Sequence, residues 1–201
     1  MARLQLSKSS LSRETTDLKT YRQFLPSLDL KRQELMTRRA KAKKILEQTK
    51  IDIDSKMKEI GEKLPMLSND KVDLKGLVVV KAVLLEEENV MGAYLPVLKD
   101  VQIETRDYSF LVKPHWVDDA AAKLREMSTL KIRIQVEQRR LELLNEAVRK
   151  ITQRVNLFDK VLIPRTRENI KRIKIYLSDA ERAAVINAKL AKNKRLREAE
   201  L

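Results

Sequence analysis

The sequence predicts a mainly α-helical fold, in which a long antiparallel two-helix coiled coil carries a small β-hairpin head inserted between its helices. Charged residues make up 36% of the 201 residues and aromatic residues only 4%, with three glycines. This composition is typical of long exposed helices. Apolar residues recur at alternating steps of three and four towards both ends of the chain, whereas the middle shows strand-like alternation. We therefore expect three segments, at 1–64, 65–116 and 117–201.

The C-terminal segment carries the clearest coiled-coil seam, a stripe of apolar side chains that must face a partner helix. The seam consists of Leu141, Leu144, Val148, Ile151, Val155, Phe158 and Leu162. It resumes at Ile170, Ile173 and Leu177. The step from Leu162 to Ile170 is one residue longer than a heptad, so we expect the stripe to drift there, beside Pro164.

The N-terminal segment has a weaker seam. Its apolar members are Leu11, Leu18, Tyr21, Leu25, Leu28, Leu35, Ala42, Leu46, Ile53 and Ile60, and its polar members are Arg32, Arg39, Thr49 and Lys56. Pro26 removes a backbone hydrogen bond at a cost of about 3 kcal/mol, so the helix either kinks or breaks there. We expect a kink near Pro26, because Leu25 and Leu28 stay in register across it. Two such amphipathic helices bury each other's stripes by folding back antiparallel.

The middle segment predicts a β-hairpin. Residues 78–85 are rich in β-branched side chains, residues 101–105 alternate apolar and polar side chains, and residues 89–96 contain turn-forming Gly92 and Pro96. We expect strands near 82–90 and 97–105. Because an isolated hairpin is marginally stable in water, we expect it to pack on the helix ends through Leu77, Val79 or Phe110.

Charge is unevenly distributed around a net value of +14. Residues 31–50 carry eight basic against two acidic side chains, and residues 165–201 carry eleven against five. Such a field favours an acidic protein surface, nucleic acid or anionic lipid as partner. No apolar run is long enough to span a bilayer, and residues 1–10 lack the apolar core of a secretory signal. We therefore expect a cytoplasmic chain.

The residues that usually carry chemistry are sparse. There is no cysteine and one histidine, and three scattered glycines cannot form a phosphate-binding loop. We interpret His115 as a helix-entry or packing residue. Consecutive strand residues point to opposite faces, so Glu86, Glu87 and Glu88 suit a solvated edge better than a cation site. We expect no catalytic residue, cofactor or metal.

Three motifs follow one another in a fixed order. The first is Leu30-Lys31-Arg32 with Leu35, the second is Asn89-Val90-Met91-Gly92 with Pro96, and the third is Arg154-Val155-Asn156, Val161, Ile163-Pro164, Asn169-Ile170, Ile173, Leu177 and Glu181-Arg182. Together they resemble the D subunit of V/A-type ATPases, the central rotor stalk, over about residues 11–192.

The resemblance implies a non-catalytic axle lodged in a hexamer of A and B subunits. Such an axle carries the F subunit and docks onto a socket, the C or d subunit, above the membrane ring. It transmits torque between the ATP sites and the ion-translocating rotor, without inserting into the membrane and without binding nucleic acid. On this basis we expect a cytoplasmic location, peripheral to a membrane through the complex.

Exposed charge contacts are individually weak and can be exchanged as an axle turns. The expected contacts with the A/B hexamer are therefore basic: Arg38, Arg39, Lys43, Arg165, Arg167, Lys171 and Arg172. The expected regulatory or lower-stalk contacts lie in the hairpin: Met91, Gly92, Tyr94 and Pro96.

Two other classes stay open at this point. A prefoldin-like coiled-coil chaperone would need apolar, flexible arm tips, but residues 1–10 and 189–201 are polar and charged. A basic nucleic-acid-binding coiled coil is compatible with the charge, although no reader motif or aromatic stacking platform accompanies it.

Overall fold

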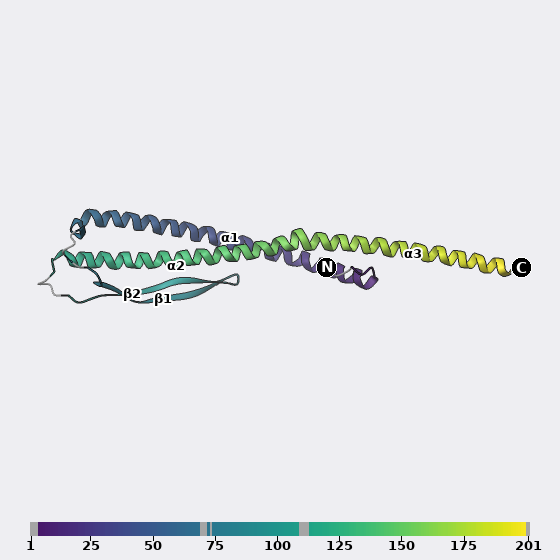
Figure 1. Ribbon diagram of the computed structural model, residues 1–201, viewed down its shortest axis with the longest axis horizontal. Coiled ribbons are helices and arrows are strands. Elements are labelled where there is room, and N and C mark those ends of the chain that lie inside the picture. Colours follow the sequence, from purple (N-terminus) through teal and green to yellow (C-terminus); the bar gives the residue numbers. More distant parts are fainter. Residues whose placement is uncertain (1–3, 69–71, 73, 109–112, 200–201) are drawn as a thin grey trace. The chain divides into compact units, whose positions relative to one another are not determined.

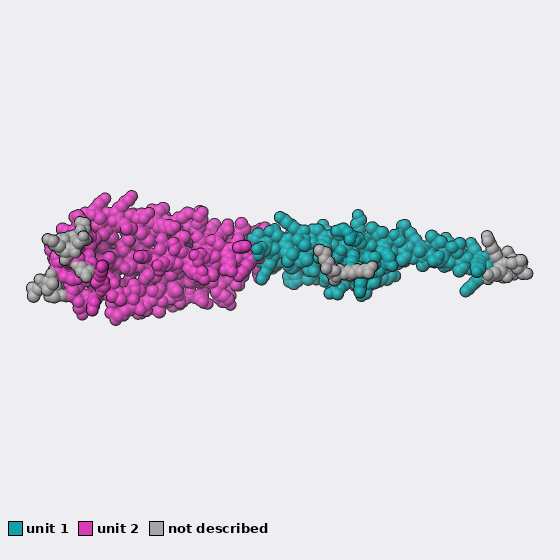
Figure 2. Space-filling view, viewed as in Figure 1, with its two compact units in different colours: residues 1–30, 151–201 teal, residues 31–150 magenta. Residues whose placement is uncertain are grey.

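The computed structural model describes residues 4–68, 72, 74–108 and 113–199, without the side chains of 68 and 196–199. In chain order, the elements in Figure 1 are helix α1 (Lys8–Lys63), a 3₁₀ turn (Pro65–Ser68), strands β1 (Val78–Val90) and β2 (Ala93–Thr105), helix α2 (Trp116–Asn156), a π-helical segment (Leu157–Leu162) and helix α3 (Ile163–Ala199). They form two compact units (Figure 2): residues 1–30 with 151–201, called unit 1, and residues 31–150, called unit 2. Each unit takes a stretch from both long helical segments.

Helix α1 begins with a side-chain cap. The Ser7 hydroxyl accepts a hydrogen bond from the Ser10 backbone N–H at 3.2 Å, which satisfies one of the free donors of the first turn. The helix then runs unbroken through Pro26 to Lys63, which excludes a break at the proline. Every apolar member of the predicted N-terminal seam is buried or half-buried, and Thr49, a polar member, retains only 4% exposure.

In unit 2, α1 pairs with α2 in antiparallel sense. Lys56 on α1 binds Glu126 on α2 at 3.1 Å. Where α1 ends and α2 begins, a core cluster closes the unit: Leu64, Leu77, Trp116, Val117, Ala120 and Ala121 are all buried together. Asp118 and Asp119 lie in the first turn of α2, where the helix dipole favours negative charge.

In unit 1, the start of α1 pairs with the π segment and α3, again antiparallel. The rings of Tyr21 and Phe158 meet edge to face at 5.5 Å, and the Asn169 amide donates to Glu14 at 3.2 Å. Residue numbers thus rise on one segment as they fall on the other. With the pairing in unit 2, this confirms the predicted class of antiparallel two-helix coiled coil with a small hairpin.

The π segment explains the drift of the C-terminal seam. Ile163 N–H bonds to Phe158 O, five residues back, because the α-helical ladder widens just before Pro164, which has no N–H. The widened turn holds one residue more than a regular α-helical turn. The buried stripe passes from Val155 to Ile163 and then to Thr166 and Ile173. The eight-residue step between buried seam positions therefore lies at 155–163, rather than at 162–170 as we expected from the spacing. Phe158 and Leu162, which we expected in the seam, are half-buried.

The hairpin is longer than predicted, because its turn takes only two residues. Met91 and Gly92 have φ of 53° and 89°, and the two-residue loop with positive φ matches the right-handed twist of the strands. Gly92 N–H donates to the Asn89 side chain at 2.9 Å. Pro96 does not belong to the turn, as we expected from the sequence; it lies inside β2, opposite Glu87. Proline is tolerated there because each strand of a two-stranded sheet is an edge.

The hairpin lies along α2 in Figure 1 and is not confined to the helix ends. Of its three expected anchors, Leu77 is buried in the core cluster at 3% exposure. Val79 is 46% exposed, so Leu77 rather than Val79 is the anchor among the expected alternatives. Phe110 lies outside the described residues. Two bulges interrupt the strand pairing, and the extra residue in each is a lysine, Lys81 or Lys99.

No described helix combines the length and apolar character needed to cross a membrane. Over the same described residues, no cluster of three or more histidine, aspartate or glutamate side chains is arranged to hold a metal ion.

Candidate partner-binding site

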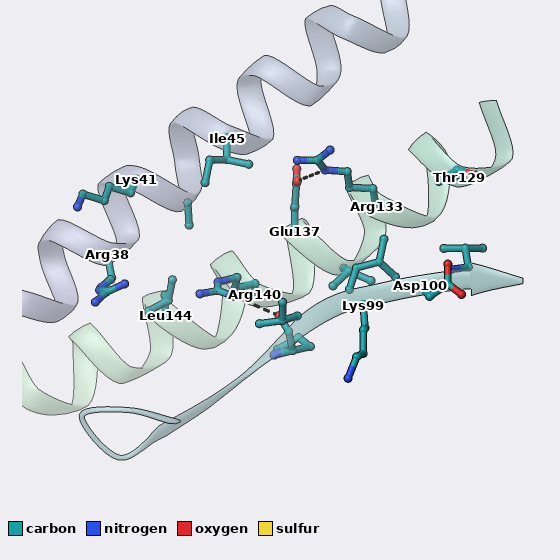
Figure 3. A pocket seen from close by; sticks show the side chains of 16 residues that line it. Arg38, Lys41, Ile45, Lys99, Asp100, Thr129, Arg133, Glu137, Arg140 and Leu144 are labelled. Atoms are coloured by element: carbon teal, nitrogen blue, oxygen red, sulfur yellow. Dashed lines mark hydrogen bonds and ion pairs between the residues drawn. The ribbon is translucent and has the colours of Figure 1, made fainter. Parts of the chain in front are cut away.

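A cavity of about 650 Å³ in unit 2 lies between α1, α2 and β2 (Figure 3). We call it the hairpin groove. It is lined by Arg38, Lys41, Ala42 and Ile45 of α1, by Thr129, Arg133, Val136, Glu137, Arg140 and Leu144 of α2, and by residues 96–101 of β2. The positions on each helix follow steps of three and four, so each helix contributes a single face.

The floor of the groove is apolar. Leu144 is 1% exposed and Ala42 is 8% exposed, because both belong to the α1–α2 seam. Ile45 stands one helical turn further along α1 and remains 49% exposed. The groove thus has buried seam residues at its floor and one partly exposed apolar side chain, Ile45, outside the seam.

Arg140 fastens the hairpin to α2. Its guanidinium binds the Glu88 carboxylate of β1 at 2.5 Å and the Pro96 carbonyl of β2 at 3.4 Å. Nearer the start of α2, Arg125 donates to the Ile103 carbonyl of β2 at 3.3 Å. The two arginines are about 22 Å apart along the helix, and the two carbonyls are about 23 Å apart along the strand. Because these spacings match, one helix face can hold both ends of β2.

The electrostatics of the groove are set by helix cations. Glu34 raises the pKa of Arg38 above its usual value, first through its hydrogen bond to the guanidinium and second through its negative charge. The negative charge of Glu88 adds a smaller increase. Arg133 donates to Glu137 at 2.9 Å. The second carboxylate oxygen of Glu137 is buried and has no hydrogen-bond partner within the described structure. Four basic side chains thus line the helix walls, and three of them, Arg38, Arg133 and Arg140, are each paired with a carboxylate.

The residues predicted to contact an A/B hexamer fall in both units. Arg38, Arg39 and Lys43 lie on α1 in unit 2, whereas Arg165, Arg167, Lys171 and Arg172 lie on α3 in unit 1. All are exposed except Arg39, which is half-buried because it occupies a seam position. Several already pair along their own helix, as Arg172 does with Glu168 at 2.5 Å.

The predicted hairpin contacts separate into two places. Met91 forms the turn together with Gly92 and is 53% exposed. Tyr94, beside the turn, is 63% exposed. Pro96 instead lines the hairpin groove. His115 is exposed immediately before α2, next to buried Trp116, which agrees with its interpretation as a helix-entry residue.

Sequence reasoning missed the groove itself. Of its lining, Arg38 and Pro96 were singled out as partner contacts, and Ala42 and Leu144 as seam residues, in no case for a groove. The signal that was present is the spacing of Arg38, Lys41, Ala42 and Ile45, which marks one mixed face of α1. The approach of β2 to α2 depends on Arg125 and Arg140, and helix periodicity does not reveal such contacts.

Comparison with known proteins identifies the family. The family model described as the D subunit of ATP synthase matches residues 10–193. The chain belongs to the ATP synthase D-subunit family. It is 31% identical over 193 residues to the V-type ATP synthase D subunit of Borreliella burgdorferi, covering 96% of this chain and 95% of that protein. It is 32% identical over 202 residues to the D subunit of Chlamydia muridarum, covering 96% of each.

The V-type ATP synthase D subunit of Chlamydia felis is 40% identical to this chain over a shorter stretch of 107 residues. Membership of this family implies a place in an ATP synthase complex, and it confirms the resemblance inferred from the three motifs. It favours neither a prefoldin-like chaperone nor a nucleic-acid-binding coiled coil. Ion transport and a rotor role follow from the family.

Proposed function

We propose that this chain is the non-catalytic central axle of a V/A-type rotary ATPase. In this role it transmits torque between an A/B hexamer that hydrolyses or makes ATP and a membrane rotor that moves ions. The observation that supports the proposal most directly is the pairing of helices within each unit. Apolar residues such as Leu144 and Ile173 are sealed inside the pair, and charged residues remain outside.

A shaft of this kind must resist twisting while its surface slides past its bearing. Two helices that bury a shared seam resist bending and twisting more than a single helix does. Exposed ion pairs contribute only about 0–1 kcal/mol each, so they can be exchanged between positions at modest cost. A broad apolar interface would instead hold one orientation.

The proposal includes specific partners and a location. The A and B subunits would surround the axle, the F subunit would bind beside it, and the socket formed by the C or d subunit would receive it above the membrane ring. The chain would be cytoplasmic and peripheral to the membrane through these contacts. The seven predicted basic contacts, from Arg38 to Arg172, would face the A/B hexamer.

The decisive experiment replaces those seven basic residues together by glutamine in the assembled complex. We expect the variant to bind the A/B hexamer at least tenfold more weakly in low salt, and to uncouple ATP hydrolysis from ion movement. A matched control replaces seven other exposed basic residues: Lys50, Lys58, Lys131, Arg139, Arg149, Lys150 and Arg154. If the test variant assembles and couples as the control does, the assigned contact surface is wrong. If the unaltered chain does not assemble with A and B, the axle role itself is wrong.

A further inference from the structure

Strand β1 has an outer edge that no other described segment pairs with. β2 turns its own outer edge towards α2, where the Pro96 carbonyl accepts a hydrogen bond from Arg140. The Ile103 carbonyl likewise accepts from Arg125. In a two-stranded sheet the opposite edge belongs to β1, and no described backbone hydrogen bond joins that edge to another segment. We call it the free edge; a strand edge of this kind is a ready template for pairing with another chain.

The register of the hairpin identifies the backbone groups that lie at the free edge. In a two-residue hairpin the pair that closes the loop exchanges hydrogen bonds, and the pairs beyond it alternate between bonded and non-bonded. Val90 and Ala93 close the loop. Leu85, Glu87 and Asn89 therefore occupy non-bonded positions, and their N–H and C=O groups point away from β2.

Pro96 supports this assignment. It is paired with Glu87, at a non-bonded position, where a residue without an N–H takes nothing from the ladder. Its carbonyl is directed away from β1 and accepts from Arg140. The free edge therefore offers a donor and an acceptor about every 6.6 Å along the strand, which is the spacing that an added strand requires.

β1 exposes apolar side chains on both of its faces. Leu84 and Leu85 are 44% and 52% exposed, and consecutive strand residues point to opposite faces. Val83 beside them is exposed as well. A helix laid on one face of the hairpin would cover only one of the two leucines. A strand added to the free edge brings neighbouring side chains to both faces at once, so burial favours an extended occupant.

The charge at the free edge selects the side chains of such a strand. Glu87 has no ion pair in the described part of the chain, whereas its two glutamate neighbours pair with Lys99 and Arg140. Glu87 shares a face with Leu85, two positions away. A basic residue opposite Glu87 stabilises strand pairing, and an acidic one destabilises it. We therefore expect the added strand to carry a basic residue two positions from an apolar residue.

From these observations we propose that the free edge of β1 binds an extended segment of a partner protein, which adds a third strand to the hairpin. The backbone of this segment pairs with the N–H and C=O groups of Leu85, Glu87 and Asn89. Its apolar side chains cover Leu84 and Leu85 on the two faces, and a lysine or arginine pairs with Glu87. The inference rests on the proposed function for the source of the segment, which is another subunit of the same assembly.

Hydrogen exchange tests the backbone contacts directly, in the full chain alone and assembled with the other purified soluble subunits of the same ATPase. In the chain alone, we expect the amides of residues 85, 87 and 89 to exchange at least tenfold faster than those of residues 86 and 88, which bond to β2. On assembly the three outward amides should slow at least tenfold. Mass spectrometry at single-residue resolution measures each amide. Unchanged exchange of the three amides on assembly would overturn the proposal. Slowing in the chain alone that grows with its concentration would also overturn it, because the occupant would then be a second copy.

A pair of substitutions separates the backbone contact from the charge. Glu87→Pro removes one outward N–H and leaves the bonded positions of β1 unchanged, whereas Glu87→Ala keeps the N–H and removes the carboxylate. We expect Glu87→Pro to abolish the slowing at residues 85 and 89, and Glu87→Ala to reduce it less than about threefold. Slow exchange at residues 86 and 88 verifies that the hairpin is folded in each variant. Equal effects of the two substitutions on folded hairpins would contradict strand addition, and the comparison on the unaltered chain decides the matter if the proline variant does not fold.

A cross-link identifies the occupant. A photo-reactive benzoylphenylalanine replaces Leu85 in the same assembly, and the matched control places it at Met57, which is 58% exposed on α1. We expect position 85 to capture one extended segment with a basic residue, at a yield at least tenfold above its capture from position 57. Capture of a helical segment, capture of a second copy of this chain, or no capture would each overturn the proposal. Assembly with the A/B hexamer that persists while the free edge stays unprotected would leave the axle role standing.

Discussion

At the scale of single residues, burial decides which side chains hold the helices together. Leu144 is 1% exposed on the buried face of α2. Its replacement by alanine removes apolar contacts and leaves a cavity, so we expect the free energy of unfolding to fall by about 2–5 kcal/mol. Urea unfolding followed by circular dichroism measures this change. Leu190→Ala is the control, because Leu190 is 62% exposed and its loss should change stability by less than about 0.5 kcal/mol. Similar losses at both positions would contradict the assigned seam.

Glu126 gives unit 2 a small pH-dependent contribution. Hydrogen bonding to Lys56, followed by the charge of that lysine and then of Lys123, lowers the pKa of Glu126. Because the pKa of Glu126 is lower in the folded than in the unfolded protein, its ionised carboxylate stabilises the fold above the unfolded pKa of about 4.3. This stabilisation is lost as the pH falls through the folded pKa. Because the side chain is 46% exposed, Glu126→Gln should destabilise the protein by less than about 1 kcal/mol at pH 7. At pH 2.5 the two proteins should unfold at the same urea concentration. An equal difference at both pH values would show that the charge is not responsible.

Seam residues could be predicted from the sequence, because helical periodicity depends only on the order of apolar side chains. Leu35, Leu46 and Val148 are buried where the spacing placed them. The role of Arg140 could not be predicted, since its partners Glu88 and Pro96 lie more than 40 positions away in the chain. Such contacts depend on how the hairpin folds against α2.

At the scale of elements, the π segment is a local adjustment to one extra residue. The sequence shows that a heptad is lengthened, and the structure moves that step to Val155–Ile163, where Pro164 already disturbs the ladder. Spacing alone could not locate it, because Phe158 and Ile163 are both apolar. The hairpin shows a related difference: Pro96 was expected in the turn, whereas an edge strand accommodates it.

Deleting Asp159 should convert the π segment into ordinary α-helix. The buried residues Val155 and Ile163 would then be seven positions apart, as a regular seam requires, so stability should change by less than about 1.5 kcal/mol. Deleting exposed Lys171 instead turns Ile173 off the seam and should cost about 2–5 kcal/mol. Thermal unfolding of the two deletion variants compares them directly. Equal destabilisation would show that the π segment does not absorb a residue.

At the scale of the whole molecule, 43 basic residues against 29 acidic residues give an electrostatic field that reaches beyond any single contact. Under the proposed function, this field should steer the chain to the A/B hexamer. We expect the association rate to fall at least tenfold between about 20 and 300 mM NaCl, because salt shortens the range of the attraction. Stopped-flow fluorescence measures the rate. A rate independent of salt would mean that the basic residues do not guide assembly.

The tight turn at Met91–Gly92 offers a practical opportunity. Its two residues lie at the end of the hairpin loop, and Met91 is 53% exposed. This sequence has no cysteine, so Met91→Cys would place a single reactive thiol on the molecule. A gold particle or polarised dye attached at that one point would report the angle of the hairpin in an individual complex as ATP is consumed.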